Sequence, residues 1–343
     1  MMDHLRRGRP LFILLGLLGL MGGQLVFTNA LAKSTQLFTI TPLDDESYAE
    51  SYTLVARIKD QSYLLVQAMV MNGGIGDEKP ACRILYVPHA SKKGINEVER
   101  GGSWVASKPE GKLRVGSCTL RETASGAVWQ ARTENLKVDL ILKGKKGRFR
   151  TKGMSYKENA EESFFDHELI MPWAKMRGQI TQKNRSAVQV KGRGTLNHTR
   201  STALPPQVSK RLLKLYLFPK ESESTKQGAL LEVKQSPKGT LSAWSWGERG
   251  SSPLDQSPSA LSLPKTWKNG IKRGDQVLII PGSVPYEFTQ IKKMYTYEPI
   301  KAYGIAGRLL KRWVGDPLNV TSFVEVRSKH GVLNGFIEEI TLR

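Results

Sequence analysis

SAVQVKGRGTLNH, Ser186–His198, alternates along its length between two sets of side chains. A period of two is that of a β-strand, whose successive side chains point to opposite faces. The stretch therefore predicts a strand with His198 on its more apolar face, directed toward an interior. The first face carries Val188, Val190, Gly192, Gly194, Leu196 and His198, and the second carries Gln189, Lys191, Arg193, Thr195 and Asn197.

The role of His198 on that face has two interpretations. A buried imidazole beside a cavity can hydrogen-bond the polar end of a ligand or move a proton. An imidazole bonded to a neighbouring strand or loop is a core residue. Gly192 and Gly194 leave the same face bare, which fits either a sharp bend of the sheet or room for a ligand.

The rest of the chain has the same character. Short segments rich in Val, Ile, Thr and aromatic residues alternate with turns, and no segment keeps a sustained helical period. One short helix is expected within 204–213. Many short antiparallel strands predict an all-β fold of sandwiches or closed barrels. At about 150 residues per domain, the chain is expected to form two domains that meet near Gln182–Ser186.

The segment Tyr63–Met71 is apolar on both faces. Leu64, Val66, Ala68 and Val70 lie on one face, whereas the other carries Tyr63, Leu65, Gln67, Met69 and Met71. A sheet with one solvated side shows polar residues on that side. This strand is therefore expected to be covered outside as well as inside, either by packing of the two domains or around a cavity for an apolar ligand.

The first 32 residues predict a secretory signal peptide. A basic start, MMDHLRRGRP, precedes the apolar run LFILLGLLGLMGGQLVF and the small-residue end Ala30-Leu31-Ala32, which is the order found in cleaved leaders. Cleavage after Ala32 predicts a periplasmic or secreted protein with domains 33–184 and 185–343. An uncleaved inner-membrane anchor is the alternative, although the run is short for a spanning helix of about 20 residues.

The chain is strongly basic. Its 343 residues carry a formal net charge of +21. Removal of Arg6, Arg7, Arg9 and Asp3 with the leader would leave 49 basic and 30 acidic side chains, a charge of +19. Such a surface is attracted to anionic lipids, acidic glycans or nucleic acid. Export argues against nucleic acid, so an anionic membrane is the expected partner, and a solvated basic face without a specific partner is the alternative.

Cysteine and histidine usage narrows the chemistry. Cys82 and Cys118 are the only cysteines, and an oxidising compartment would permit one disulfide between them. Spacing alone leaves that pairing open. The histidines after the leader show no ligand spacing, and no nucleotide-binding motif occurs in a suitable context, so neither a metal nor a cofactor is expected. These histidines are His89, His167, His198 and His330.

Two aromatic pairs and one polar doublet are further candidates. Trp244 and Trp246 share one face of a predicted strand, as do Tyr295 and Tyr297. Such pairs line a pocket or pack between sheets. The doublet Asp166-His167 suggests catalysis, but neighbours in a strand point in opposite directions.

At 192–211 the chain resembles a known group of proteins. The pattern G-R-G-x-x-x-H followed by LPPQVSKR is similar to the start of the second domain of the tandem lipocalins. That group includes the fungal survival-factor proteins, the bacterial hydroxyneurosporene synthase (a carotenoid hydratase) and AttH-like proteins. SYLLVQAMVMNGGIGDEK and ELIMPWAKMRGQI resemble strands of its first domain. The resemblance implies two consecutive lipocalin-like antiparallel β-barrels packed together.

The same resemblance bears on the chemistry. The hydratase branch has Gly-x-Gly-Tyr-x-Asp-His-x-Trp-Gly here, with the Asp and His implicated in hydration. This chain keeps the histidine as His198 but has Asn197 and Arg200 in place of the Asp and Trp. An amide cannot serve as a carboxylate acid or base. The chain therefore looks closer to the survival-factor branch, which handles lipids.

Three functions follow as expectations. The first is an exported carrier of a lipid or other hydrophobic ligand, with His198, Arg200, Trp244 and Trp246 near its pocket. The second is a hydratase or isomerase on an isoprenoid-like or polyketide-like substrate, in which His198 works with a carboxylate from another strand. The third is a structural or interaction protein with solidly packed barrels. The candidate carboxylates are Glu287, Glu325 and Glu338.

Overall fold

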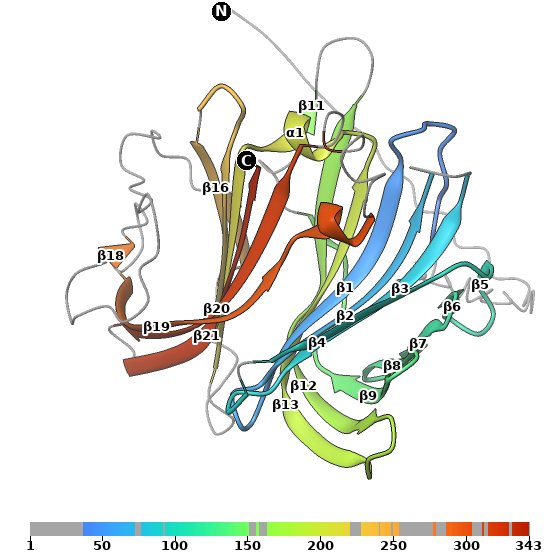
Figure 1. Cartoon of the computed structure of the whole chain (residues 1–343), viewed down its shortest axis with the longest axis horizontal. Coiled ribbons are helices and arrows are strands. Elements are labelled where there is room, and N and C mark those ends of the chain that lie inside the picture. Colours follow the sequence, from blue (N-terminus) through green and yellow to red (C-terminus); the bar gives the residue numbers. More distant parts are fainter. Residues whose placement is uncertain are drawn as a thin grey trace, which may run out of the picture. The chain divides into compact units, whose positions relative to one another are not determined.

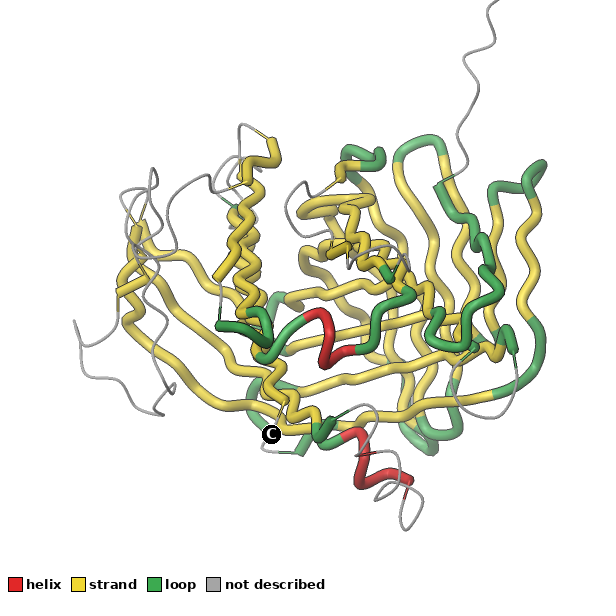
Figure 2. Tube along the Cα trace, turned by 90° about the horizontal axis from the view of Figure 1, so that it is seen from above, coloured by secondary structure: helices red, strands yellow, loops and turns green. Residues whose placement is uncertain are grey.

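The regular secondary structure of the described chain is almost entirely antiparallel β-sheet, as the sequence predicts (Figures 1 and 2). The computed structural model describes residues 37–72, 77–91, 93–150, 156–157, 163–219, 228–239, 241–247, 250–253, 277–278, 286–303, 311, 315–328 and 331–342. The predicted leader lies outside these residues, as do the side chains of Trp244 and Trp246. No helix in the described part is long and apolar enough to span a membrane.

The strands form two sheets. In the first sheet the order is β4-β3-β2-β1-β13-β12-β9-β8-β7-β6-β5, and β10 and β11 also pair with β12. Its bounds are β1 Ala49–Ile58, β2 Tyr63–Met71, β3 Lys79–Val87, β4 Ile95–Arg100, β5 Trp104–Ser107, β6 Lys112–Val115, β7 Cys118–Thr123, β8 Gly126–Arg132, β9 Leu136–Lys143, β10 Phe149–Arg150, β11 Tyr156–Lys157, β12 Phe164–Gln182 and β13 Val188–Ser201.

The second sheet has the order β17-β16-β15-β14-β21-β20-β19-β18. Its bounds are β14 Arg211–Phe218, β15 Ala229–Gln235, β16 Leu241–Gly247, β17 Gly250–Pro253, β18 Val277–Leu278, β19 Tyr286–Tyr297, β20 Pro317–Ser328 and β21 Gly331–Leu342. Among the residues that the structure describes, the helical segments α1 (Pro205–Val208) and the 3-10 helix η3 (Pro299–Tyr303) accompany the sheets.

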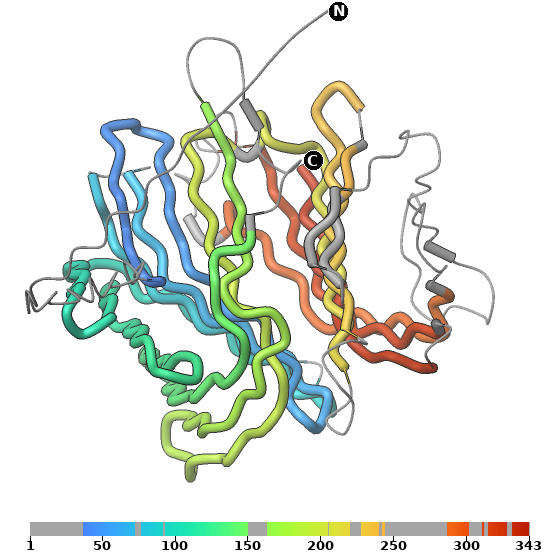
Figure 3. Tube along the Cα trace, turned by 180° about the vertical axis from the view of Figure 1, so that it is seen from behind, coloured from blue at the N-terminus to red at the C-terminus, as the bar shows by residue number. Residues whose placement is uncertain are grey.

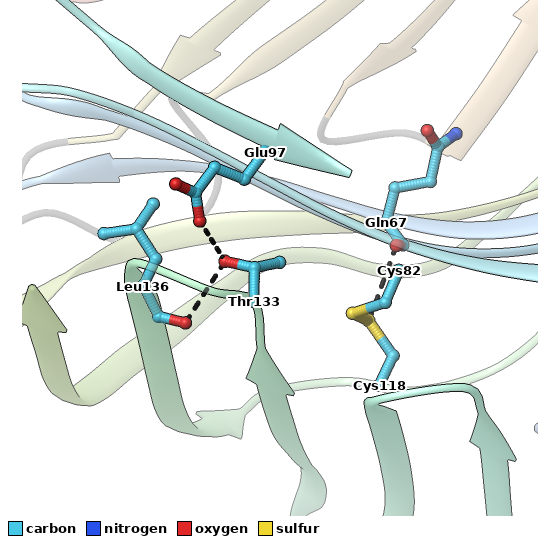
Figure 4. Close-up of a disulfide and its surroundings, with 6 residues drawn as sticks. All are labelled: Gln67, Cys82, Glu97, Cys118, Thr133 and Leu136. Atoms are coloured by element: carbon cyan, nitrogen blue, oxygen red, sulfur yellow. Dashed lines mark hydrogen bonds between the residues drawn. A yellow bond between two sulfur atoms is a disulfide. The ribbon is translucent and has the colours of Figure 1, made fainter. Parts of the chain in front are cut away.

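The first sheet curls until strands distant in its order meet. Cys82 on β3 and Cys118 on β7 form a disulfide, with 5.4 Å between their Cα atoms. Glu97 on β4 accepts a hydrogen bond from the Thr133 hydroxyl, just beyond the end of β8 (Figure 4), and another from the backbone N–H of Asn135. The enclosed face is packed with apolar side chains, among them the buried Trp129. The first sheet is therefore curled into a barrel-like shape, here called the first barrel, whose interior is filled with apolar side chains.

β2 is covered on both faces, which confirms the expectation from its two apolar sides. Leu64 and Val66 belong to the core inside the first sheet, whereas Tyr63 and Leu65 belong to a second core between the two sheets. The strands β14, β20 and β21 supply the other half of that inter-sheet core, through residues such as Tyr216 and Phe336. Packing between the two sheets therefore accounts for Tyr63 and Leu65 on the outer face, and Met69 and Met71 farther along it line a cavity.

The chain passes from the first sheet to the second at 202–210, not at the boundary expected at 184/185. The turn near 183–185 is real, but it joins β12 to β13 within the first sheet. β13 also pairs with β1 from Ala49 to Ile58 (Figure 3). The alternation of side chains predicts the position of this turn correctly, but it does not show whether the strands on the two sides of the turn belong to the same sheet. The expected helix within 204–213 shrinks to the single turn α1, because β14 begins at Arg211.

Candidate functional site

His198 faces the inside of the first barrel, as the alternation predicts. It lies across from Tyr52 on β1 and from Glu168 on β12. Its ring stacks on the Tyr52 ring with 4.5 Å between their centroids. The opposite face of β13 is buried too, because Arg193, Thr195 and Asn197 are almost fully covered. A face with these polar side chains would ordinarily contact solvent, but in this structure it is covered and points toward the second sheet.

Two carboxylates bracket the imidazole of His198. Glu50 Oε1 lies 2.7 Å from Nε2, and Glu168 Oε2 lies 3.1 Å from Nδ1. The expectation that Glu287, Glu325 or Glu338 supplies this carboxylate is wrong, because those residues lie on β19, β20 and β21 of the second sheet. No local pattern marks Glu50 and Glu168 as partners of His198, because their proximity depends on which strands flank β13.

Cations and hydrogen bonds complete this cluster, here called the His198 network. Arg148 Nη1 donates to Glu168 Oε2 at 2.7 Å, and Arg200 Nε lies 3.8 Å from Glu50 Oε2. The His198 hydrogen bond is the main reason that the pKa of Glu168 falls to about 2. Burial lowers the pKa of His198, but its hydrogen bonds to Glu168 and Glu50 outweigh burial and hold that pKa above its usual value. The network therefore favours an imidazolium between two carboxylates.

The His198 network is suited to stability rather than to proton transfer. An imidazolium that donates both N–H groups has no free lone pair with which to accept a proton. The chain also covers the network with its own residues. Arg148 Nη2 donates to Leu37 O at 3.1 Å, Thr41 N donates to Glu50 at 2.9 Å, and Phe38 is fully buried nearby.

Gly192 and Gly194 lie where β1 approaches closely. A Cβ built on Gly192 would lie 2.0 Å from Arg57 O, and one on Gly194 would lie 2.7 Å from Leu54 Cδ1. These positions require glycine because the neighbouring strand fills the space above them. Close packing against β1 accounts for both glycines, and Leu54 and Ala56 occupy the space above Gly194.

A cavity of about 290 Å³ lies between the two sheets. It is here called the inter-sheet cavity. Such a volume is at the low end of the range for small-molecule sites. β1, β2, β3 and β13 provide one wall, and β14, β19, β20 and β21 provide the other. Its polar and aromatic lining includes Tyr63, Arg83, Asn197, Lys214, Tyr216, Tyr295, Tyr297, Thr321 and Glu338.

Glu338 is one of the two acidic residues in this lining, with Glu339 as the other. The Tyr63 hydroxyl donates a hydrogen bond to Glu338 Oε1. Burial raises the pKa of the Glu338 carboxyl, even though the Tyr63 hydrogen bond and the charges of Lys214 and Arg83 act in the other direction. Tyr216 is buried in the same wall, and burial together with Glu338 raises its pKa as well. The cavity wall thus favours a carboxyl and phenols that hold their protons.

A buried ion cluster lies next to Glu338. Lys214 Nζ is 3.2 Å from Glu232 Oε1, and His167 Nδ1 is 3.3 Å from the same oxygen. Burial alone raises the pKa of Glu232, but the nearby His167 and Lys214 reverse this and lower it to about 2. Asp166 is exposed whereas His167 is buried, which confirms that the two point in opposite directions. His167 therefore works with Glu232 on β15 rather than with Asp166.

The candidate residues from the sequence fall into two sites, the His198 network and the inter-sheet cavity. His198 and Arg200 both approach Glu50 in the His198 network. Tyr295 and Tyr297 line the inter-sheet cavity, as the pocket interpretation of that pair predicts. The chain brings no group of three or more His, Cys, Asp or Glu side chains into a metal-binding arrangement within its described residues.

Comparison with known proteins shows similarity in structure and not in sequence. No family model and no curated protein matches the sequence. An AttH protein of Nitrosomonas europaea superposes with a TM-score of 0.57 at 9% identity, covering 86% of this chain and 92% of that one. Kievitone hydratase from Nectria haematococca gives 0.53 at 11% identity, over 86% and 88% of the two chains.

A third solved structure, CghA with Sch210972, gives a TM-score of 0.57 at 9% identity over 89% of this chain and 94% of CghA. All three are proteins with tandem lipocalin-like barrels. Identities this low establish the fold alone. The expectation from the sequence is confirmed at that level, and the chain has the tandem lipocalin-like fold.

Proposed function

We propose that the chain is an acid–base enzyme of the hydratase or isomerase class, with Glu338 in the inter-sheet cavity as its proton donor and acceptor. The observation that carries the proposal is a carboxyl with a raised pKa in a cavity wall, hydrogen-bonded to the buried Tyr63 hydroxyl. Carboxyl groups raised in this way serve as general acids near neutral pH. Tyr63 orients the acid and offers a second exchangeable proton.

The proposed chemistry balances with water as the only co-reactant. In a hydration, Glu338 gives its proton to one carbon of a polarised double bond, and water adds to the neighbouring carbon. The proton that the added water loses then restores the Glu338 carboxyl. In an isomerisation, the carboxylate takes a proton from one carbon and returns it to another. Kievitone hydratase has this fold, which supports the reaction class without identifying a substrate for this chain.

The lining of the cavity favours chemistry over transport of a lipid. A carrier for an alkyl chain needs an apolar pocket, and burying polar groups against such a chain is costly. Tyr63, Lys214 and Glu338 all face this cavity. The interior of the first barrel is packed with side chains, including Phe38. Export, and docking of the basic chain on anionic membranes, remain predictions from the sequence.

The proposal is tested by proton exchange and water addition on small enones. The wild-type protein is expected to accelerate deuterium incorporation into, or hydration of, members of a panel that includes cyclohex-2-enone, followed by NMR in heavy water. Glu338→Gln removes the titrating group and is expected to lower the rate by roughly 10²–10⁴-fold, the usual contribution of a general acid or base.

Glu325→Gln is the matched control. Glu325 lies on β20 of the same sheet, accepts a hydrogen bond from Thr289 and is not among the residues that line the cavity. This variant is expected to keep the wild-type rate. A Glu338→Gln protein as active as the control, or a wild-type protein inactive on the whole panel, would contradict the proposal.

A further inference from the structure

A second cavity, of about 210 Å³, adjoins the inter-sheet cavity. The two share Gln67, Arg83, Tyr297 and Asn319 in their walls. Beyond this shared wall the second cavity is lined by Met69, Met71, Ala81, Val98, Arg100 and Pro299. Methionine side chains adapt to apolar groups of varied shape. Arg83 therefore lies at the junction of the inter-sheet cavity and a more apolar one.

Both sheets hold the guanidinium of Arg83 in place. Its Nε donates to Asn96 Oδ1 on β4 at 2.9 Å, and its Cζ lies 4.6 Å from the ring centroid of Tyr297 on β19. The hydrogen bond uses only Nε, and the Tyr297 ring contacts only one face of the guanidinium plane. The N–H groups of the two Nη atoms lie in that plane, where they can donate to a ligand. A fork that is already ordered loses little entropy when it binds a planar anion.

The charge of Arg83 is not matched by an ion pair. Across the described residues, no carboxylate lies within ion-pair distance of Arg83, and neither Nη group makes a hydrogen bond. By contrast, Lys214 in the same cavity wall is paired with Glu232, and Arg211 is paired with Glu339. A partly buried cation without a counter-charge is costly unless a ligand supplies one.

We infer that Arg83 binds the carboxylate of the substrate, so that the substrate is a compact organic acid. The inference deepens the proposed function and rests on it for the chemistry, because a carboxylate held by Arg83 would place the remainder of the same molecule in the cavity that contains Glu338. Two parallel hydrogen bonds from one guanidinium match a carboxylate. A phosphate dianion fits less well, since Glu339 also lines the cavity and its carboxylate would repel a second negative charge.

The test compares an acid with its neutral isostere. Cinnamate and cinnamamide have the same size and shape and differ in charge, and their dissociation constants are measured by NMR titration of the intact protein. Wild-type protein is expected to bind cinnamate roughly tenfold or more tightly than cinnamamide, which is the scale of a charge-assisted pair. Arg83→Gln is expected to reduce that ratio to about one, and Arg83→Lys is expected to restore part of it because lysine keeps the charge but loses the fork.

Arg114→Gln is the control for a simple loss of positive charge. Arg114 lies exposed on β6 and is not among the residues that line either cavity, so this variant is expected to keep the wild-type ratio. Equal binding of acid and amide by the wild type, failure of both to bind, or a preference that survives Arg83→Gln would overturn the inference.

Glu338→Gln separates this inference from the proposed function. Removing an acidic group near Arg83 is expected to preserve the preference for cinnamate. If that preference depends on Arg83 while Glu338→Gln leaves turnover intact, the acid-binding site stands and the proposed enzyme does not. If turnover depends on Glu338 while Arg83→Gln leaves the preference unchanged, the enzyme stands and the acid-binding site does not.

Discussion

Replacing His198 with leucine is expected to lower the free energy of unfolding by about 3–5 kcal/mol, the usual cost of removing one partner from a buried ion pair. The side chain of His198 is 8% exposed and that of Glu50 is 2% exposed. Without the imidazolium, Glu50 and Glu168 would face one another with less positive charge between them. Chemical denaturation of the variant and the wild type at pH 6 measures the difference.

The pH dependence of this loss identifies its cause. A folded pKa above the ordinary 6.5 of His198 means that the stabilisation is fully present below pH 6.5 and disappears as the pH rises through the raised value. The variant should therefore lose more stability at pH 6 than at pH 9. Adding Glu50→Gln to His198→Leu should recover part of the loss. A change below about 1 kcal/mol at pH 6 would show that the network contributes little.

Breaking the disulfide between Cys82 and Cys118 is expected to cost about 4 kcal/mol. The bond spans 36 residues of sequence, so it removes much of the freedom of the unfolded chain. It also joins β3 to β7 across the first barrel. The measurement compares denaturation of the oxidised protein with that of the same protein in reductant and with that of the Cys82→Ala, Cys118→Ala double variant.

The double variant is the better control, because it has no disulfide that the reductant could break. Its midpoint should match that of the reduced wild type and should not move when reductant is added. Coincident midpoints for oxidised and reduced wild type would show that packing alone closes the first barrel.

The strand pattern could be predicted from the sequence because it depends on local periodicity. Alternation placed His198 inside the first barrel and marked β2 as covered on both sides. Local periodicity does not mark every turn. The stretch LRVGSCTL, 113–120, forms the hairpin β6–β7, in which Gly116 adopts a φ of 55° that favours glycine. β13 follows the expected boundary near 184/185 in sequence and yet pairs within the first sheet, because strand pairing is not a local property.

The acidic partners could not be predicted, because they depend on strand pairing over long sequence distances. Glu50 is 148 residues from His198 in sequence and 2.7 Å from it in space. Glu338 was one of three carboxylates singled out, but as a partner of His198 rather than of Tyr63. Arg83 attracts no notice in the sequence, since its importance comes from Asn96, Tyr297 and the cavities around it.

The proposed function requires that the inter-sheet cavity hold a carboxyl with a raised pKa. A carbon-13 NMR pH titration of protein labelled at the glutamate side-chain carboxyls tests this, with the Glu338 signal assigned by its absence from Glu338→Gln. We expect the Glu338 carboxyl to titrate above the ordinary 4.5 of glutamate. Tyr63→Phe should shift its pKa further upward, because the Tyr63 hydroxyl stabilises the carboxylate. A Glu338 signal that titrates at or below the ordinary value would contradict the proposed function.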